Sequence, residues 1–83
     1  MINRNVEANK RFGARLRVAR LARGWSQDEL WVHSGIATSQ IGKIERGVAN
    51  PTLSTLVDLA RALNVPVGDL LPPDDYLGLA NAG

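Results

Sequence analysis

The sequence predicts an all-α domain of five helices. Apolar residues recur with helical spacing along most of the chain, an alternation of period two never persists, and Gly and Pro separate the helical segments. With 83 residues, of which 45% are hydrophobic, the chain can bury one small core but not two. We therefore expect one domain over residues 6–71 and a C-terminal tail over residues 72–83.

The first predicted helix begins at about residue 6 or 8 and ends at residue 23, before Gly24. An apolar stripe at positions i, i+4 and i+7 supports it, formed by Phe12, Leu16 and Ala19. This stripe is expected to face the core.

The second and third predicted helices each end before a glycine. Ser26 and Glu29 form a capping-box pattern at the start of the second helix, which ends near Ser34 and is followed by Gly35. The third predicted helix covers about residues 38–46.

The fourth predicted helix covers about residues 53–63, and its apolar stripe is Leu56, Leu59, Ala60 and Leu63. Pro66 stands in a first-turn position and starts a short fifth helix that ends at Leu70 and Leu71. Two prolines then prevent the tail from continuing the helix. The tail is expected either to be loose or to pack onto the domain or a second subunit through Tyr76, Leu77 and Leu79.

Charge is distributed unevenly along the chain. From residue 1 to residue 47 nine Lys and Arg face four Asp and Glu, whereas from residue 48 onward one Arg faces four Asp. The first part therefore carries +5 and the second −3. A cationic surface on a small domain attracts polyanions, most often nucleic acid, although a merely solvated surface is the alternative.

The composition argues against several classes of function. Cysteine is absent and His33 is the one histidine, so we expect no metal, no cofactor and no enzyme. No stretch reaches the roughly 18 apolar residues of a membrane span, and "MINRNVEANKRF" lacks the apolar run of a signal peptide. We expect a soluble cytoplasmic protein without a membrane partner.

The connection between the second and third helices predicts a helix-turn-helix. The three residues "GIA" are too few to return the third helix antiparallel along the second, so the two helices must cross steeply. Gly35 tolerates the left-handed backbone that such a corner requires.

Four segments in fixed order resemble the phage-repressor (Xre/Cro) helix-turn-helix family: "FGARLRVAR", "GWSQDEL", "SGIATSQIGKIERG" and "NPTLSTLVDLARALNVPVGDLL". The resemblance covers about residues 12–71 and implies a five-helix lambda-repressor-like DNA-binding domain. In size the chain is similar to restriction-modification controller proteins. It also resembles the DNA-binding portion of regulators with a C-terminal cupin sensor, so it could be an excerpt of a longer protein.

The third helix has two different faces. On a helical wheel Ile41 and Ile44 point one way and the polar residues point the other. The major groove of B-DNA admits a helix and offers donors and acceptors that polar side chains can distinguish. The resemblance implies base contacts from Thr38, Ser39, Gln40 and Lys43. The alternative is a polar face that is simply solvated.

The resemblance also implies contacts to the DNA backbone. Gln27 lies in the first turn of the second helix, where the helix N-terminus favours an anion, and is expected to bind phosphate and to brace Thr38. As an alternative, Gln27 is only a good helix former. Further phosphate contacts are expected from Arg46, Asn50, Arg11 and Arg15, the last two sharing a face of the first helix.

Glu45 points toward the core edge of the third helix, where an unpaired carboxylate would be costly. The resemblance implies that Arg20 of the first helix pairs with it. We expect this Arg20–Glu45 ion pair to have a structural role and no catalytic one.

Two residues depart from the family pattern. Trp31 stands where the family usually has alanine, and we expect a compensated core substitution there that widens the helix crossing; the alternative is a direct role in binding a ligand or DNA. Ala37 replaces the usual hydroxyl cap of the third helix, so Thr38 is expected to act as the cap and to be less available for a base.

One helix-turn-helix buries too little DNA surface for tight specific binding, and the resemblance implies two-fold dimers on palindromic sites. The expected function is a sequence-specific transcriptional regulator that binds double-stranded DNA as a homodimer. The alternative is an antitoxin that neutralises a partner toxin and autoregulates its operon. The expected dimer interface comprises Val65, Val67, Leu70, Leu71 and Tyr76.

Overall fold

The computed structural model describes residues 4–72 and confirms the all-α prediction. Over this range the chain forms no strand and five helices: α1 Arg4–Ala22, α2 Gln27–Ser34, α3 Thr38–Glu45, α4 Leu53–Leu63 and α5 Val67–Leu70. The bounds follow the predicted ones closely, except that α1 begins earlier than expected. Within the same residues, no helix is both long enough and apolar enough to cross a bilayer.

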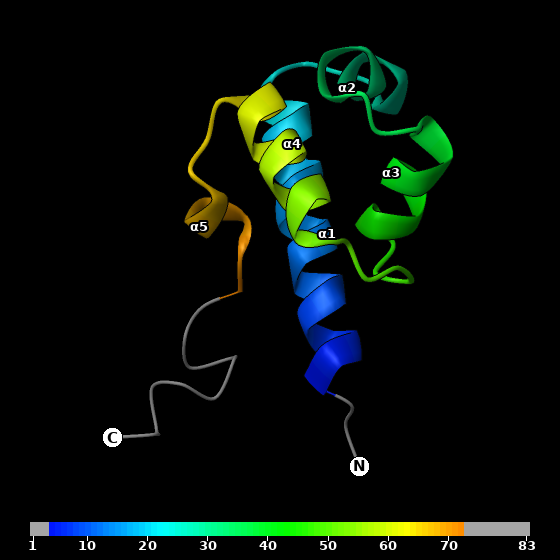
Figure 1. The fold of residues 1–83 in the computed structure, drawn as a ribbon, viewed down its shortest axis with the longest axis vertical. Helices are drawn as coiled ribbons and strands as arrows, with labels where there is room; N and C mark the ends of the chain where they lie inside the picture. The colour runs from blue at the N-terminus through cyan, green and yellow to red at the C-terminus, as the bar shows by residue number, and fades with distance from the viewer. Residues whose placement is uncertain (1–3, 73–83) are drawn as a thin grey trace.

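Helix α1 runs through the middle of the domain (Figure 1), with α3 on one side and α5 on the other. Helix α2 packs against both α3 and α4, and α5 packs against α1 and α4. The two sides of α1 therefore belong to different parts of the molecule: one supports the helix-turn-helix and the other supports α5.

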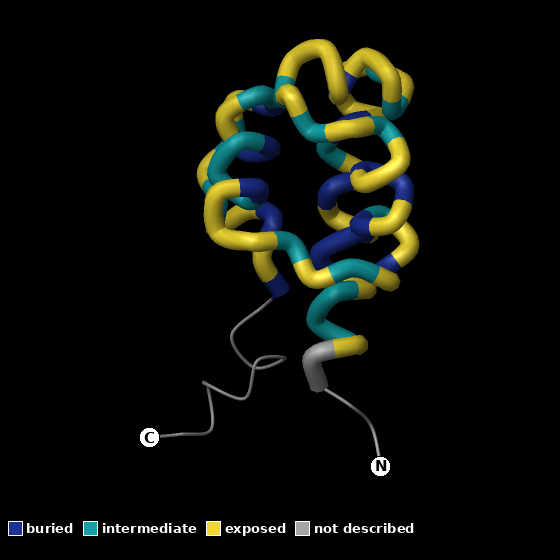
Figure 2. The backbone as a smooth tube through the Cα atoms, turned by 45° about the vertical axis from the view of Figure 1, so that its right-hand side comes forward, coloured by how far each residue is buried: buried dark blue, intermediate teal, exposed yellow. Residues whose placement is uncertain are grey.

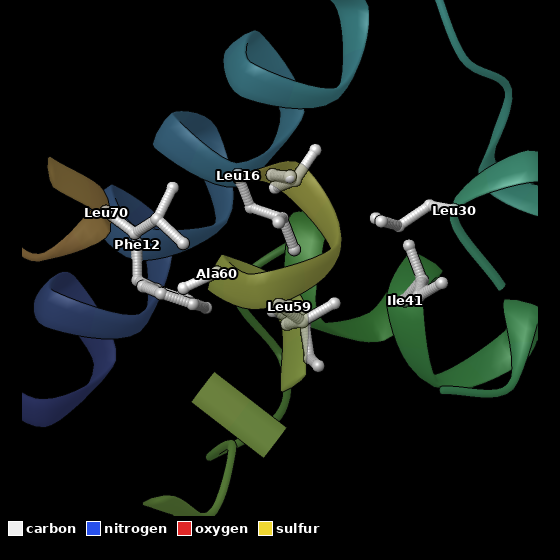
Figure 3. Close-up of a cluster of buried hydrophobic side chains, with 9 residues drawn as sticks. Phe12, Leu16, Leu30, Ile41, Leu59, Ala60 and Leu70 are labelled. Atoms are coloured by element: carbon white, nitrogen blue, oxygen red, sulfur yellow. The ribbon is translucent and has the colours of Figure 1, made fainter. Parts of the chain in front are cut away.

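The core draws side chains from all five helices, which alternate buried and exposed positions along the backbone (Figure 2). In Figure 3, Leu30 of α2 and Ile41 of α3 point toward one another within the core cluster. The buried hydrophobic residues are Phe12, Leu16, Leu30, Ile41, Ile44, Leu59, Ala60, Leu63 and Leu70.

Two residues lie elsewhere than the sequence analysis expected. Leu70 is only 2% exposed, which corrects its assignment to a dimer interface, because a side chain enclosed by its own core offers no surface to a partner. Trp31 is 50% exposed and so is not a core substitution. The short helix α2 turns Leu30 inward, and the next residue, about 100° further round the helix, points away from the core.

The predicted corner and cap are present. Gly35 adopts φ +78°, in the left-handed region, and its backbone N–H donates to the carbonyl of Trp31 at 2.8 Å. The hydroxyl of Ser26 accepts from the N–H of Glu29, and the carboxylate of Glu29 accepts from the N–H of Ser26. These groups fix both ends of α2.

A glycine that the sequence analysis did not single out sets the distance between α1 and α3. A Cβ atom added to Gly13 would lie 2.2 Å from the carbonyl oxygen of Ile44 and 2.7 Å from that of Glu45. Any other residue would therefore collide with the backbone of α3. The two helices cross more closely here than a side chain allows.

The expected ion pair joins the same two helices. Nε and Nη2 of Arg20 donate to the two carboxylate oxygens of Glu45 at 2.7 and 2.9 Å, in a bidentate arrangement. The side chains are 9% and 5% exposed, and Nη1 of Arg20 also donates to the carbonyl of Trp25. The hydrogen bonds to Glu45 raise the pKa of Arg20, against the opposing effect of burial, so the guanidinium stays charged.

We expect Gly13→Ala to lower the free energy of unfolding by about 2 kcal/mol or more, because overpacking against backbone outweighs the gain in helix propensity. Denaturant unfolding followed by circular dichroism measures this. Gly68→Ala is the matched control, since a Cβ at Gly68 meets no atom within 4 Å. Equal unfolding midpoints for the two variants would contradict the close crossing.

We expect Arg20→Ala to cost about 3–5 kcal/mol of stability, because it leaves the carboxylate of Glu45 buried without its cation. The exposed Arg17, one turn earlier on α1, provides the control variant Arg17→Ala, which should change stability by about 0.5 kcal/mol or less. A thermal melt of Arg20→Ala that matches the parent would refute the structural role of the pair.

Candidate nucleic-acid interface

Helix α3 is anchored on one side and open on the other. Ile41 and Ile44 are 0% and 1% exposed and lie in the core. Ser39, Gln40 and Lys43, three of the four residues expected to contact bases, are exposed. Within the described residues, their polar face is therefore accessible to a ligand.

Thr38, the fourth expected base-contacting residue, is half-buried and differently placed. Its hydroxyl donates a hydrogen bond to Oδ1 of Asp28 at 2.7 Å. The cap position of α3 is Ala37, which makes no side-chain cap hydrogen bond. Our expectation that Thr38 caps the helix is thus wrong, because Thr38 already lies inside the first turn and its hydroxyl turns toward α2.

The side chain of Gln27 donates a hydrogen bond to the Arg20–Glu45 ion pair and does not brace Thr38. Its Nε2 donates to Oε1 of Glu45 at 3.1 Å, so that Glu45 receives hydrogen bonds from both α1 and α2. This corrects the expected brace between Gln27 and Thr38. The side chain of Gln27 passes a buried glycine of α3.

That glycine, Gly42, was not recognised as part of the site. A Cβ there would lie 3.1 Å from Nη1 of Arg46 and 3.6 Å from Oε1 of Gln27. Glycine inside a helix costs roughly 1 kcal/mol relative to alanine. Here a Cβ would be tight against the end of the Arg46 side chain and would make an ordinary van der Waals contact with Gln27, two residues that were expected to contact phosphate.

The first turn of α2 already contains two carboxylates. Asp28 and Glu29 lie in its first turn, and Glu29 closes the capping box with Ser26. These carboxylates interact favourably with the positive end of the helix dipole. The dipole therefore gives Gln27 less help in attracting a phosphate than the sequence analysis assumed.

Three polar residues gather where α3 ends and the connection to α4 begins. Arg46 is exposed at the C-cap, and Asn50 accepts a hydrogen bond from the side chain of Asn9 on α1. Lys10 of α1 packs so closely on Gly47 that a Cβ on this glycine would lie 2.6 Å from Cγ of the lysine. Arg46, Asn50 and Lys10 thus provide donors beside α3.

Lys10 was missed, although a signal for it exists in the sequence. Lys10, Gly13, Arg17 and Arg20 follow the spacing i, i+3, i+7 and i+10, which places them on one side of a helix. Gly13 and Arg20 touch α3 in the structure, so this is the side that faces the helix-turn-helix.

Arg11 and Arg15 lie on the other side of α1. Both line a groove between α1 and α5 together with Val65 and Asp69, and Nη1 of Arg15 donates to the carbonyl of Asp69 at 3.3 Å. The structure does not bring them to α3, and their expected contact to the DNA backbone stays a prediction.

The remaining residues expected at a dimer interface are distributed around α5. Val65 and Val67 are half-buried against the core, and Leu71 is 37% exposed. Tyr76 lies outside the described residues. Of the five residues expected at this interface, Leu71 has the most exposed described side chain.

Comparison with known proteins identifies the family. A model of the helix-turn-helix family HTH_3 matches residues 16–70. The uncharacterized HTH-type transcriptional regulator y4dJ of Sinorhizobium fredii is 34% identical over 70 residues, which cover 84% of this chain and 91% of the relative. The regulator y4dL of the same organism is 50% identical over 52 residues, 63% of this chain, but the match spans about a quarter (26%) of that relative's length.

Solved structures agree with this assignment. The restriction-modification controller protein C.AhdI from Aeromonas hydrophila superimposes with a TM-score of 0.74 at 40% sequence identity, covering 76% of this chain and 96% of the controller protein. The family match, the y4dJ similarity and this superposition lead to one conclusion. The chain belongs to the HTH_3 helix-turn-helix family of DNA-binding transcriptional regulators.

Proposed function

We propose that the protein is a sequence-specific transcriptional regulator that binds a palindromic operator as a homodimer, with α3 as the recognition helix in the major groove. The observation that carries this proposal is the two-sided character of α3. Its isoleucines are enclosed by the core, while Ser39, Gln40 and Lys43 are exposed on a surface that the described chain leaves uncovered. A helix presented in this way has the dimensions that the major groove accepts.

The exposed residues of α3 supply chemistry suited to base edges. The Lys43 ammonium donates to the O6 and N7 acceptors of guanine, and the amide of Gln40 can donate and accept at once, as adenine requires. Ser39 and Thr38, near the start of α3, supply hydroxyl groups. Together these side chains would read the operator sequence.

A second group of residues would hold the DNA backbone without reading sequence. Arg46 offers a guanidinium at the end of α3, and Asn50 offers its amide N–H group because its carbonyl oxygen accepts from Asn9. Gln27 donates one hydrogen to Glu45, and its amide nitrogen carries a second one. Lys10 adds a cation at the same edge.

Dimerisation would supply the second recognition helix. A single helix-turn-helix buries too little DNA for high affinity, and two copies related by a two-fold axis contact half-sites about one helical turn apart. Val65, Val67 and Leu71 would form the shared surface, joined by Tyr76 of the tail. The similarity to a restriction-modification controller and to HTH-type regulators supports a role in controlling gene expression.

In vitro selection of bound DNA from a random pool tests base reading. We expect a two-fold symmetric motif, and we expect Lys43→Ala to lose about 1–3 kcal/mol of discrimination at one position of each half-site while the other positions keep their preference. Selection of a motif without symmetry would refute the dimer, and equal affinity for all sequences would refute base reading.

Salt dependence of binding separates backbone contacts from base contacts. We expect Arg46→Ala to weaken binding to every sequence alike and to reduce the slope of log K against log salt by about 1. Arg61→Ala is the matched control. It also removes an exposed arginine, but Arg61 lies in the last turn of α4, a helix that supplies none of the proposed DNA contacts. An Arg46→Ala slope equal to that of the control would rule out the phosphate contact.

A further inference from the structure

The hydroxyl of Thr38 is held by a carboxylate of the preceding helix. Oγ1 of Thr38 donates to Oδ1 of Asp28 at 2.7 Å. Asp28 lies in the first turn of α2, whose backbone is fixed by the Ser26–Glu29 capping box, and Thr38 is the first residue of α3. The hydrogen bond therefore connects the starts of the two helices of the helix-turn-helix.

This hydrogen bond determines whether the Thr38 hydroxyl can donate to a ligand or only accept from it. A threonine hydroxyl has one hydrogen to donate and two lone pairs that accept, whereas an ionised carboxylate only accepts. The hydrogen between the two side chains must therefore come from Thr38. The hydroxyl keeps only its acceptor function toward any other group.

Local structure favours this arrangement over a freely rotating hydroxyl. The positive end of the α2 dipole stabilises a carboxylate in its first turn. Thr38 is not drawn away to cap α3, because Ala37 occupies the cap position and Thr38 stands one residue inside the helix. Asp28 is exposed and Thr38 half-buried, so the pair lies at the edge of the surface formed by α3.

We propose that Asp28 is a specificity determinant: by taking the hydrogen of Thr38, it makes this residue select a base with an amino group, adenine or cytosine, at the position it faces in each half-site. In the major groove the N6 group of adenine and the N4 group of cytosine donate, whereas guanine and thymine present acceptors there. The inference rests on the proposed function, because it requires α3 to lie in the major groove.

The methyl group of Thr38 provides a competing explanation for any preference at this position. It could contact the C5 methyl of thymine, which is a common apolar contact in the major groove. The two explanations predict different bases and different mutant behaviour. Thr38→Val keeps the methyl and removes the hydroxyl, and Thr38→Ser does the reverse.

The test is in vitro selection of DNA with the parent, Thr38→Val, Thr38→Ser, Asp28→Ala and Asp69→Ala. The Asp69 variant is the matched control, because it removes one exposed acidic group on α5. We expect one position per half-site at which the parent favours adenine or cytosine about 2- to 10-fold. Thr38→Ser and Asp69→Ala should keep this preference, Thr38→Val should lose it, and Asp28→Ala should admit guanine or thymine there.

Three outcomes would overturn the proposal. These are a parent preference for guanine or thymine at the position that Thr38→Val relaxes, a preference that survives in Thr38→Val but not in Thr38→Ser, and an unchanged preference in Asp28→Ala. Thermal melts of each variant exclude unfolding as the cause. If the parent selects no sequence at all, the proposed function itself fails, whereas a motif that responds to Lys43→Ala but to neither Thr38 nor Asp28 variants refutes this inference alone.

Discussion

The position of α3 depends on how closely this helix can approach α1. Gly13 allows backbone to meet backbone, and the bidentate Arg20–Glu45 pair lies on the same two helices. The glycine removes a steric clash between the helices. The ion pair adds a directional attraction between charges that are almost fully removed from solvent. Because a buried carboxylate without its cation is costly, this pair admits few alternative placements of α3. The outward face of α3 is defined only once this inner contact is fixed.

Helix α2 adds two further constraints, both through polar side chains. Gln27 donates to Glu45 and so joins the ion pair, while Asp28 accepts from Thr38 at the start of α3. Gly42 lies next to the glutamine, and a Cβ there would make an ordinary van der Waals contact with it. Consecutive residues of α2 thus hold the two ends of α3. Hydrogen bonds of this kind orient the helix as well as attach it, which matters for a surface that would read base edges.

Side-chain orientation around a helix explains which site residues were placed correctly. Ile41, Ile44 and the exposed residues of α3 follow directly from helical periodicity, because one short helix on a core has an unambiguous inner face. Arg11 and Arg15 share a face as expected, but the sequence does not say which neighbour covers which side of the long helix α1. Their side faces α5, and Lys10 occupies the side of α3 instead. Trp31 was misplaced for a similar reason, since size and apolarity alone do not show which way a residue of a short helix points.

The sequence by itself determined the five helices, the capping box of α2, the steep corner at Gly35 and the apolar stripes, because these depend on local backbone preferences and on periodicity. The resemblance added the Arg20–Glu45 pair. Only the tertiary structure decided that Gly13 and Gly42 are contact points, that Gln27 binds Glu45 and that Asp28 binds Thr38. These features join residues distant in the chain, and their partners are set by the distance and angle between packed helices, which no local pattern contains.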